Sequence, residues 1–412
     1  LIYNAVTDAW FAGAKEGEFA DLERLGGGFA EHRAMFLSPD GVFRAEEVFE
    51  PRGFGVVNYT VLTVYVLALV GMGVYFSRRE KTTKEFFLAG KRIPWWAAGL
   101  SIFGTQLSAI TFVAIPARTF SSDWLYFIGA FINIAMVPLV IFFFLPFYRR
   151  LNLTTAYEYL EQRFNLAVRL FGSLSFLLFQ VGRMAIVVLL PSLTLAAVTN
   201  IDVRVCILVI GVIATIYTIL GGMEAVIWTD VIQVVVLVGG ALAALIVVFL
   251  DVQGGAPAVF EMASEHDKLR YAIFSWDLAG PTLFVMLLQF PNSIIPFMSD
   301  QVVIQRYLTT RDEKGAAKGI WLNAILGIPA FLIFFSIGTA LWVFYRTHPE
   351  AMDPTMAQAD GVFPWFIVTQ LPAGLSGLVV AGIFAASMSS LDSSMNSMAT
   401  AITTDFYRRL IP

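Results

Sequence analysis

Polar residues that could bind a cation interrupt the apolar stretch at residues 378–408, which is otherwise long and apolar enough to cross a bilayer as a helix. They are Ser387, Ser389, Ser390, Asp392, Ser393, Ser394, Asn396 and Ser397. Hydroxyl and carboxylate oxygens are hard ligands that suit a hard cation. An ionisable residue at membrane depth also indicates a functional site by default. The stretch therefore predicts a cation-binding site inside the membrane.

The spacing of these residues defines two overlapping groups on a helix, where residues three and four apart share a face. Ala386, Ser389 and Ser390 form the first group. Ser389, Asp392 and Ser393 form the second. A purely structural role is the alternative, because serines allow close helix packing and can donate hydrogen bonds to their own helix.

The composition identifies a polytopic membrane protein. Hydrophobic residues make up 58% of the 412 residues and charged residues 14%, and the mean hydropathy is +0.73, far from the values of soluble domains. The net charge of −4 argues against a nucleic-acid partner. The single cysteine, Cys206, excludes a disulfide within the chain and a cysteine-based metal site.

Nine apolar runs approach or exceed the roughly 20 residues that a membrane-spanning helix needs. The predicted spans are 55–76, 95–117, 124–147, 166–197, 203–220, 227–250, 280–299, 319–344 and 366–404. A short amphipathic helix is expected at 154–163, on the membrane surface.

Lysines and arginines gather after the first, third, seventh and ninth spans, and the group after the seventh is Arg306, Arg311, Lys314 and Lys318. With nine spans these connections lie on one side, whereas the loops 251–279 and 346–363 are richer in acids. The positive-inside rule places the basic connections in the cytoplasm and the N-terminal segment outside. We expect a multi-pass protein of a bacterial inner membrane.

Residues 1–53 are polar and contain no spanning segment. Residues 2–10 have the pattern of a strand end, a turn and a strand start, and they resemble a blade edge of a kelch β-propeller; an ordinary soluble tail is the alternative. We therefore expect an extracytoplasmic soluble segment and linker at 1–53 and a transmembrane domain at 54–412. The chain starts at Leu1 rather than Met, so we also expect a fragment or a processed segment.

Two predicted spans are poor helices in their middle. Pro94 and Gly99 precede residues 104–108 in the second span, and the seventh contains Pro291 and Pro296. Proline removes a backbone donor and interrupts a helix. Broken helices at corresponding positions of two inverted repeats are typical of the binding sites of secondary transporters. We therefore expect an all-α polytopic fold with an inverted five-plus-five helix repeat (LeuT-like), preceded by an extra helix and ending after the third helix of the second repeat.

Three motifs, in the expected order, resemble the sodium:solute symporter family, which includes sodium–sugar, sodium–proline and sodium–sialic acid symporters. They are residues 87–96 (FLAGKRIPWW), 221–233 (GGMEAVIWTDVIQ) and 385–397 (AASMSSLDSSMNS). The resemblance runs from about residue 55 to the C-terminus. It implies a symporter that uses Na+ and a small organic solute, works in a lipid bilayer and is not an enzyme.

The resemblance also implies a main sodium site where the second and ninth spans meet. Its ligands would be the backbone carbonyls of Gly104 and Leu107 on the second span, and the Ala386 carbonyl with the hydroxyls of Ser389 and Ser390 on the ninth. Gly104 stands where the family usually has Ala. Only its carbonyl is needed, so we expect the site to be intact.

A second sodium site, known in some members, would match Asp230, Ser389, Asp392 and Ser393. Asp392 departs from the hydroxyl or small residue that is usual there. Two carboxylates near one cation would bind it tightly, and without the cation their repulsion would favour protonation. The alternative is that Asp392 pairs with a Lys or Arg of the remaining helices of the second repeat.

Arg183 is predicted to lie in the middle of a span, so it needs a partner. One expectation is an ion pair with Asp230 or Asp392. The other is a substrate carboxylate, which the planar guanidinium would bind through two hydrogen bonds. In the sialic acid branch of the family, the residue matching Arg183 binds the substrate carboxylate.

Other polar residues of the second and seventh spans are candidates for substrate contact. In the sialic acid branch, hydroxyls that match Ser108 and Thr111 bind the substrate. Gln106 and Gln289 lie at the helix breaks, where they either contact substrate or satisfy loose backbone groups. The predicted substrate is a small organic anion, a carboxylated sugar such as sialic acid.

Two other functions stay open at this point. A transporter-like module can serve as a membrane sensor or receptor, which a signalling region downstream would favour. A membrane-anchored propeller enzyme, a mutarotase, could be fused to the transporter, which a complete propeller upstream would favour. The spans contain neither a phosphate-binding glycine loop nor a nucleophile–histidine pair, which argues against an ATP-driven pump.

Overall fold

The structure is a computed structural model. It describes residues 54–78, 83–151, 153–199, 201–276, 282–288, 290–353, 356 and 358–410, together with four short strands near the N-terminus. The strands form two antiparallel pairs: β1 (Ile2–Asn4) with β2 (Ala9–Phe11), and β3 (Met35–Ser38) with β4 (Gly41–Arg44). The first pair coincides with the strand–turn–strand pattern of residues 2–10.

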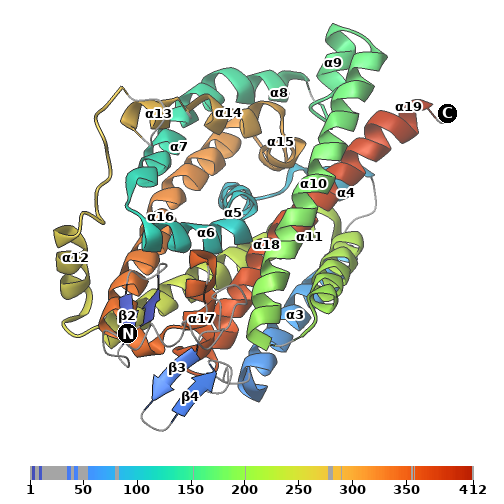
Figure 1. Cartoon of the computed structure of the whole chain (residues 1–412). Helices are drawn as coiled ribbons and strands as arrows, with labels where there is room; N and C mark the ends of the chain where they lie inside the picture. Colours follow the sequence, from blue (N-terminus) through green and yellow to red (C-terminus); the bar gives the residue numbers. More distant parts are fainter. Residues whose placement is uncertain are drawn as a thin grey trace.

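Helices form the rest of the regular structure (Figure 1). In chain order they are α3 (Gly55–Ser77), α4 (Thr83–Leu88), η1 (Ala89–Lys91), α5 (Trp95–Gln106), α6 (Ala109–Ser121), η2 (Leu125–Phe127), α7 (Ile128–Leu139), η3 (Val140–Phe144), α8 (Leu145–Leu151), α9 (Glu158–Arg163), α10 (Leu166–Thr199), α11 (Val203–Asp251), α12 (Gly255–Glu265), α13 (Leu283–Leu287), α14 (Phe290–Ser299), α15 (Gln301–Leu308), α16 (Glu313–Thr347), η4 (Pro349–Ala351), η5 (Ala359–Gly361), α17 (Val362–Thr369), α18 (Leu375–Ala401), η6 (Ile402–Tyr407) and α19 (Arg408–Leu410). Within the described residues, six helical stretches are long and apolar enough to cross a membrane, or seven if the bent pair α5–α6 counts as one span.

The break in the second predicted span is confirmed. Helices α5 and α6 meet at an angle of 60°. The N–H of Ser108 donates to the carbonyl of Gln106 at 3.1 Å instead of continuing the α-helical pattern. Carbonyls in the last turn of α5 therefore lose their usual partners and can bind other groups. The seventh predicted span is also interrupted: it contains α13 and α14, and Asp300 then caps the start of α15.

Some predicted boundaries are wrong. A single span at 366–404 does not form, because α17 ends at Thr369 and α18 begins only after Gly374, whose φ of +90° strongly favours glycine. The spans at 203–220 and 227–250 are joined as the 49-residue α11 and are separated only by a kink at Gly222 (φ 50°, ψ −152°).

The surface helix expected at 154–163 starts later than predicted. Helix α9 begins at Glu158, whose Oε1 accepts hydrogen bonds from the backbone N–H groups of Thr154 and Thr155 at 3.0 and 2.9 Å. These bonds satisfy two donors just before the helix begins. The side chain of Glu158, the first residue of the helix, therefore fixes the point where the helix begins.

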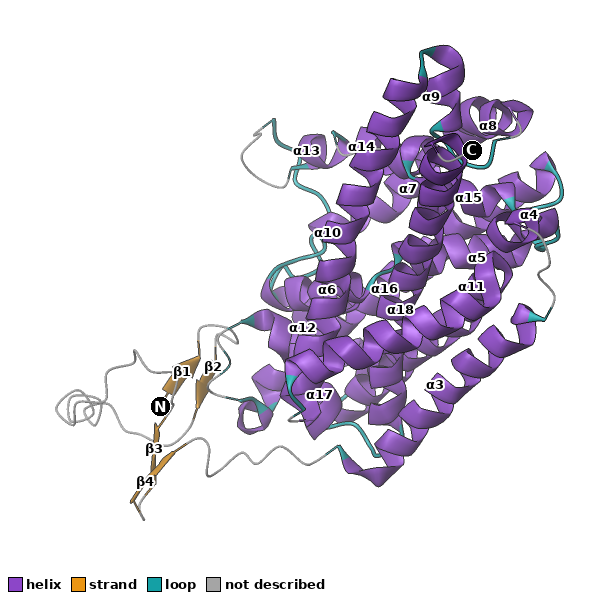
Figure 2. Cartoon of the chain, turned by 90° about the vertical axis from the view of Figure 1, so that its right-hand side faces the viewer, coloured by secondary structure: helices purple, strands orange, loops and turns teal. Residues whose placement is uncertain are grey.

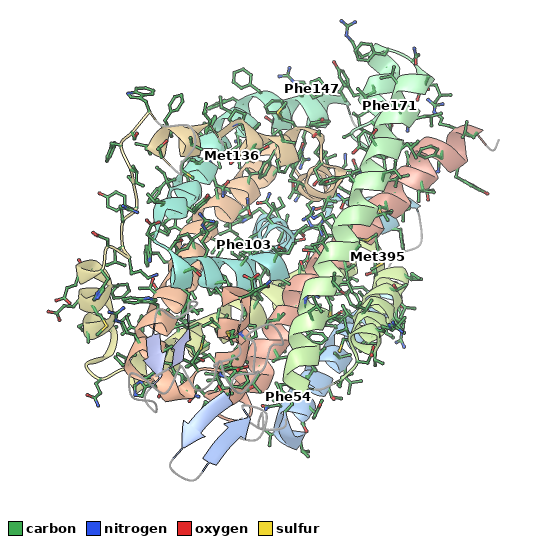
Figure 3. The ribbon with its side chains drawn as sticks, viewed as in Figure 1. Phe54, Phe103, Met136, Phe147, Phe171 and Met395 are labelled. Atoms are coloured by element: carbon green, nitrogen blue, oxygen red, sulfur yellow. The ribbon has the colours of Figure 1, made fainter. Side chains whose placement is uncertain are left out.

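The two ends of the bundle differ as the charges of the connections predict. Helices α4, α8, α9, α15 and α19, from the connections that are rich in Lys and Arg, lie at one end (Figures 1 and 2). Helix α12, from the acidic loop 251–279, and helix α17, at the end of the acidic loop 346–363, lie at the opposite end. Helix α18 runs through the bundle. In the stretch Leu375–Leu410, 89% of the most apolar segment is buried inside the protein. Side chains fill the space between the helices (Figure 3).

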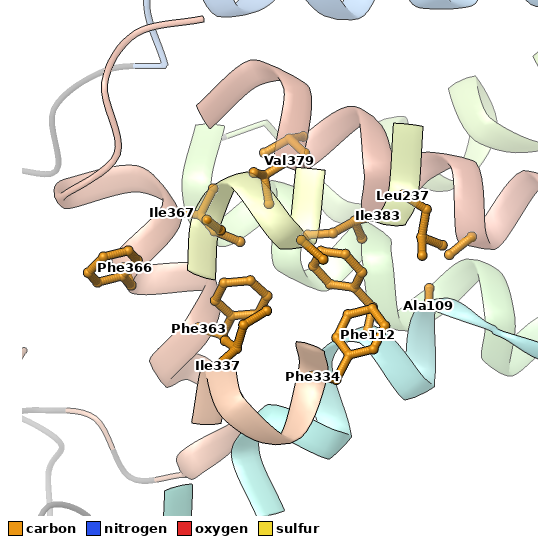
Figure 4. Close-up of a cluster of buried hydrophobic side chains, with 14 of the residues drawn as sticks. Ala109, Phe112, Leu237, Phe334, Ile337, Phe363, Phe366, Ile367, Val379 and Ile383 are labelled. Atoms are coloured by element: carbon orange, nitrogen blue, oxygen red, sulfur yellow. The ribbon is translucent and has the colours of Figure 1, made fainter. Parts of the chain in front are cut away.

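An aromatic cluster holds the second half of the broken span in place (Figure 4). Phe112 of α6 stacks on Phe363 of α17, with ring centroids 5.3 Å apart and an interplanar angle of 18°. Phe334 of α16 meets Phe112 edge-on at 5.2 Å. Such pairs add to the stability gained by burying the rings. The cluster therefore ties α6 to two helices that come much later in the chain.

Candidate functional site

The break between α5 and α6 faces the polar middle of α18. The hydroxyl of Ser390 donates to the carbonyl of Thr105 at 3.4 Å. The side-chain oxygens of Thr105 and Ser393 lie 3.0 Å apart. The helix that supplies free carbonyls and the helix that supplies hydroxyls are thus in direct contact.

The five residues predicted for the main sodium site are all buried: Gly104, Leu107, Ala386, Ser389 and Ser390. Gly104 is beside Ser389, because a Cβ placed on Gly104 would be 3.4 Å from the Ser389 hydroxyl. The same Cβ would be only 2.7 Å from Cγ2 of Val234. Glycine at this position therefore leaves room for a valine on α11, which explains the departure from Ala.

The four residues predicted for the second sodium site also lie in one cluster. Asp230 accepts a hydrogen bond from Ser389 at 2.5 Å, through Oδ1. Ser393 donates to Oδ1 of Asp392 at 3.2 Å. The second oxygen of Asp392 accepts from the hydroxyl of Tyr217 on α11 at 2.8 Å. Ser393 is thus shared between the surroundings of the two carboxylates.

Arg306 is a buried member of this cluster that the sequence analysis placed in a basic connection. That placement is wrong, because Arg306 lies on α15 with its side chain fully buried. Its Nη2 is 3.1 Å from Oδ2 of Asp230 and also donates to the hydroxyl of Ser393. Its Nε donates to the hydroxyl of Ser101 at 2.7 Å, and Nη1 to the carbonyl of Val302 at 2.8 Å.

One sequence signal could have revealed the position of Arg306. Gln301 and Gln305 are one turn apart on an eight-residue helix that follows the N-cap Asp300, Arg306 is next to Gln305, and all three are fully buried. Gln305 donates to the side chains of Asn396 and Thr400 on α18 at 3.1 and 2.9 Å. Helix α15 is therefore attached to α18 by polar side chains rather than exposed at the membrane surface.

Arg183 lies next to the helix break, but neither predicted ion pair forms. Its Nη2 donates to the carbonyl of Thr105 at 3.2 Å, and its Nη1 is 3.7 Å from Oδ2 of Asp300. The expected pairs with Asp230 or Asp392 are wrong, because Asp230 is bound by Arg306 from α15 and Arg183 is instead near Asp300. The Arg183 side chain is 25% exposed. Its guanidinium is therefore less enclosed than that of Arg306.

The other predicted substrate contacts are only partly placed. The hydroxyls of Ser108 and Thr111 lie 3.5 Å apart at the start of α6, and both residues are half-buried. Gln106 is exposed at the end of α5. Gln289 lies outside the described residues. Ser108, Thr111 and Arg183 are thus all adjacent to the same break.

Comparisons with known proteins identify similar transporters. A model of the sodium:solute symporter family matches residues 86–412. The sodium/sialic acid symporter NanT of Aliivibrio fischeri (strain ATCC 700601 / ES114) is 44% identical over 363 residues, which cover 88% of this chain and 72% of the relative. The sodium/sialic acid symporter SiaT of Proteus mirabilis (strain HI4320) is 44% identical over 359 residues, which cover 87% and 72%.

A solved structure is also similar. It is described as the substrate-bound outward-open state of a Na+-coupled sialic acid symporter with a novel Na+ site, and it aligns with a TM-score of 0.84 and 43% identity over 87% of this chain and 76% of that one. The match confirms the predicted fold class, an all-helical membrane protein of the LeuT-like type. None of the matches described here supports the kelch resemblance of the N-terminal segment.

Proposed function

Because the chain belongs to the sodium:solute symporter family, we propose that it is a sodium-coupled secondary symporter that imports sialic acid or a closely similar carboxylated sugar. One observation carries the proposal. Arg183 and Ser390 donate to the same carbonyl, that of Thr105, at the break between α5 and α6. A substrate carboxylate held by Arg183 would therefore lie beside the residues proposed to bind sodium.

The main sodium ion would take its ligands from two helices. We propose the carbonyls of Gly104 and Leu107 on α5, and the Ala386 carbonyl with the hydroxyls of Ser389 and Ser390 on α18. Each hydroxyl keeps acceptor lone pairs while it donates its hydrogen to a protein oxygen. The ion would fix α5 against α18 and so stabilise one conformation of the broken span. Because substrate favours the same conformation, each ligand must raise the affinity for the other.

The surroundings of Arg183 suit a substrate carboxylate. Its distance of 3.7 Å to Asp300 is longer than that of a charge-assisted hydrogen bond. A substrate carboxylate could bind the planar guanidinium through two parallel hydrogen bonds. The hydroxyls of Ser108 and Thr111, at the start of α6, would bind other polar groups of the sugar. Gln106 and Gln289 remain candidates for further contacts.

We also propose the second sodium site, but its environment contains the guanidinium of Arg306. Asp230, Ser389, Asp392 and Ser393 lie in one buried cluster. Arg306 already donates to Asp230 and Ser393. An ion bound by these four residues would share two of its ligands with a guanidinium, and like charges repel each other strongly where water is excluded.

We also propose the orientation and the domain division given by the sequence. The protein would be a bacterial inner-membrane protein with the end that contains α4, α8, α9, α15 and α19 in the cytoplasm, which the positive-inside rule supports. Residues 1–53 would form an extracytoplasmic segment, and 54–412 the transmembrane domain. The relatives are named as symporters, so the protein is a transporter and not an enzyme. The relatives described above do not support the sensor alternative.

Uptake by reconstituted protein tests the function. Proteoliposomes would be loaded with potassium, and uptake of radiolabelled sialic acid would be followed with sodium or potassium outside. We expect uptake only with an inward sodium gradient, and its loss in Arg183→Ala. Arg118→Ala, on the exposed face of α6, is the matched control and should transport normally. Uptake that ignores sodium would overturn the proposal, and normal uptake by Arg183→Ala would remove Arg183 from the substrate site.

A further inference from the structure

The buried ionic groups of the bundle leave one negative charge without a partner. Arg306 pairs with Asp230, and Arg183 pairs with Asp300. Asp392 is fully buried on α18, and within the part of the chain that the structure describes it forms no ion pair with a basic side chain. Arg306 has no direct hydrogen bond to Asp392 in the part of the chain that the structure describes; it donates to the hydroxyl of Ser393, which in turn donates to Asp392. One guanidinium cannot neutralise both Asp230 and Asp392, and a lone buried carboxylate is costly.

Unsatisfied polar atoms lie on the side of Asp392 that faces α3 and α11. Tyr217 donates to Asp392 at 2.8 Å, and the amide nitrogen of Gln233 donates to the Tyr217 hydroxyl at 3.3 Å. The Oε1 atom of Gln233 and the hydroxyl of Tyr65 are buried without any hydrogen-bond partner. Buried polar atoms in native proteins are nearly always bonded. Tyr65 and Gln233 are close enough to interact with each other, and a cation between them would use both of these oxygen atoms as ligands.

Close packing of α3 brings Tyr65 to this place. A Cβ on Gly73 of α3 would be 2.8 Å from Cβ of Tyr217, so glycine at this position allows the two backbones to approach. Tyr65, two turns before Gly73 on the same buried face, lies beside Gln233 and Asp392. The extra helix that precedes the first repeat thus supplies a hydroxyl to a cluster on α11 and α18.

We propose that a sodium ion binds on the α3 side of Asp392, between its carboxylate, Oε1 of Gln233 and the hydroxyls of Tyr65 and Tyr217. All of these are oxygen ligands, the kind that a hard monovalent cation prefers. The ion supplies the missing positive charge and satisfies both orphaned atoms. A neutral water molecule could satisfy the orphans but would leave the charge of Asp392 unbalanced. The proposal rests on the proposed sodium symport and places its second ion beside the tyrosines instead of at Asp230.

Arg306 explains why this ion would not occupy the cluster around Asp230. The guanidinium already binds Asp230, Ser393 and Ser101. Asp392 turns one carboxylate oxygen away from that cluster, toward Tyr217. The second ion is therefore assigned to Asp392 and the tyrosines, while the guanidinium acts as a permanent cation at Asp230.

Sodium binding to the purified full chain tests the assignment. Thermal stabilisation and equilibrium binding of radioactive sodium would be measured for the wild type, Asp392→Asn, Tyr65→Phe and Gln233→Leu. For the wild type we expect cooperative binding with a Hill coefficient of about two. In Asp392→Asn we expect it to fall to about one, with half as much sodium bound, and in Tyr65→Phe we expect the sodium midpoint to rise several-fold.

Tyr345→Phe is a matched control. The hydroxyl of Tyr345 is also buried without a hydrogen-bond partner, but it lies on α16 near Phe120 and Phe344. Its removal should leave sodium binding unchanged. If Tyr345→Phe shifted the midpoint as much as Tyr65→Phe, the effect of Tyr65 would be structural and the site would not exist as proposed.

Three further results would overturn the proposal. Wild-type sodium stoichiometry in Asp392→Asn would mean that the carboxyl group is protonated or bound to water. Loss of one ion in Asp392→Asn with no effect of Tyr65→Phe and Gln233→Leu would place the ion on the Asp230 side. A single bound sodium in the wild type would remove the extra site but leave sodium symport intact. Failure of the proposed function is distinct, because then neither sodium binding nor sodium-driven uptake would be found.

Discussion

Arg306 and Asp230 form an ion pair in the interior of the bundle, with Nη2 3.1 Å from Oδ2 and both side chains fully buried. The two residues are 76 positions apart in the chain, on α15 and α11. The pair therefore links α15, the helix that follows the interrupted seventh span, to α11, the helix that carries the second family motif. It also places a fixed positive charge where a second sodium ion was expected.

Removal of Arg306 should be strongly destabilising, because Asp230 would be left as a buried unpaired charge. We expect Arg306→Gln to lower the free energy of unfolding by about 3–5 kcal/mol. The double variant Arg306→Gln with Asp230→Asn should recover much of this loss, since it removes both charges. The stabilities of the wild type, the single variant and the double variant would be measured by thermal unfolding in detergent micelles. Equal stability of the single and double variants would contradict a charge effect.

Arg149→Gln is the control for that experiment. Arg149 also binds the end of α15, but its Nη2 donates to the carbonyls of Tyr307 and Thr310, at 3.1 and 2.9 Å, and to the Thr310 hydroxyl. It has no carboxylate partner among these contacts. We expect a loss of about 1–3 kcal/mol, typical of an unsatisfied hydrogen-bonding group.

Gly104 and Val234 should behave as a size-matched pair. Gly104→Ala would place a Cβ 2.7 Å from Val234 Cγ2, so we expect a loss of about 1–3 kcal/mol from overpacking and weaker sodium binding. Val234→Ala in the same protein should restore most of both. The measurements are thermal unfolding and the sodium dependence of that unfolding. A Gly104→Ala variant with the stability of the wild type would contradict this prediction, because it would show that α5 and α11 can move apart without loss of stability.

Ser389 and Ser390 should contribute to sodium affinity, whereas Ser387 should not. The hydroxyl of Ser387 donates to the carbonyl of Val187 on α10 at 2.7 Å, away from the helix break. We expect Ser389→Ala and Ser390→Ala to raise the half-saturating sodium concentration at least about tenfold. Ser387→Ala should leave it near the wild-type value. The same shift in all three variants would indicate a general packing effect instead of loss of a ligand.

Lys268 should make stability depend on pH in the alkaline range. Its Nζ donates to the carbonyl of Phe120, at the end of α6, at 2.6 Å and lies over the ring of Trp342. Burial lowers the pKa of Lys268 from 10.5 to about 8, although Asp123 acts in the opposite direction. The folded state thus binds the proton less well than the unfolded state. Stability is lost as pH falls through about 8, and it is regained as pH rises toward 10.5.

A comparison of lysine variants isolates this effect. As pH rises from about 7.5 to 9.5, the melting temperature of the wild type should increase relative to that of Lys268→Met. Lys318→Met is the control, because Lys318 also lies near a tryptophan ring, 6.0 Å from the centroid of Trp95, but is exposed. Its profile should run parallel to the wild type. A parallel profile for Lys268→Met as well would contradict the assignment.

The sequence by itself determined the features that depend on neighbours along the chain. The apolar runs identify the membrane class, and the glycine, proline and polar residues around 104–108 identify the break. Helical spacing places Ala386, Ser389 and Ser390 on one face, because the period of a helix is fixed by its backbone. Three motifs were enough to indicate the family, which the comparisons confirm.

Only the tertiary structure decided which charges meet. Arg306 belonged by sequence to a basic connection, and its burial follows from the way that α15 packs against α11 and α18. Arg183 has Asp300 and the Thr105 carbonyl as partners, and Asp392 has Tyr217. These pairs join helices that are distant in the chain. Local periodicity fixes the face on which a side chain lies, but the charge opposite that face depends on the packing of the whole bundle.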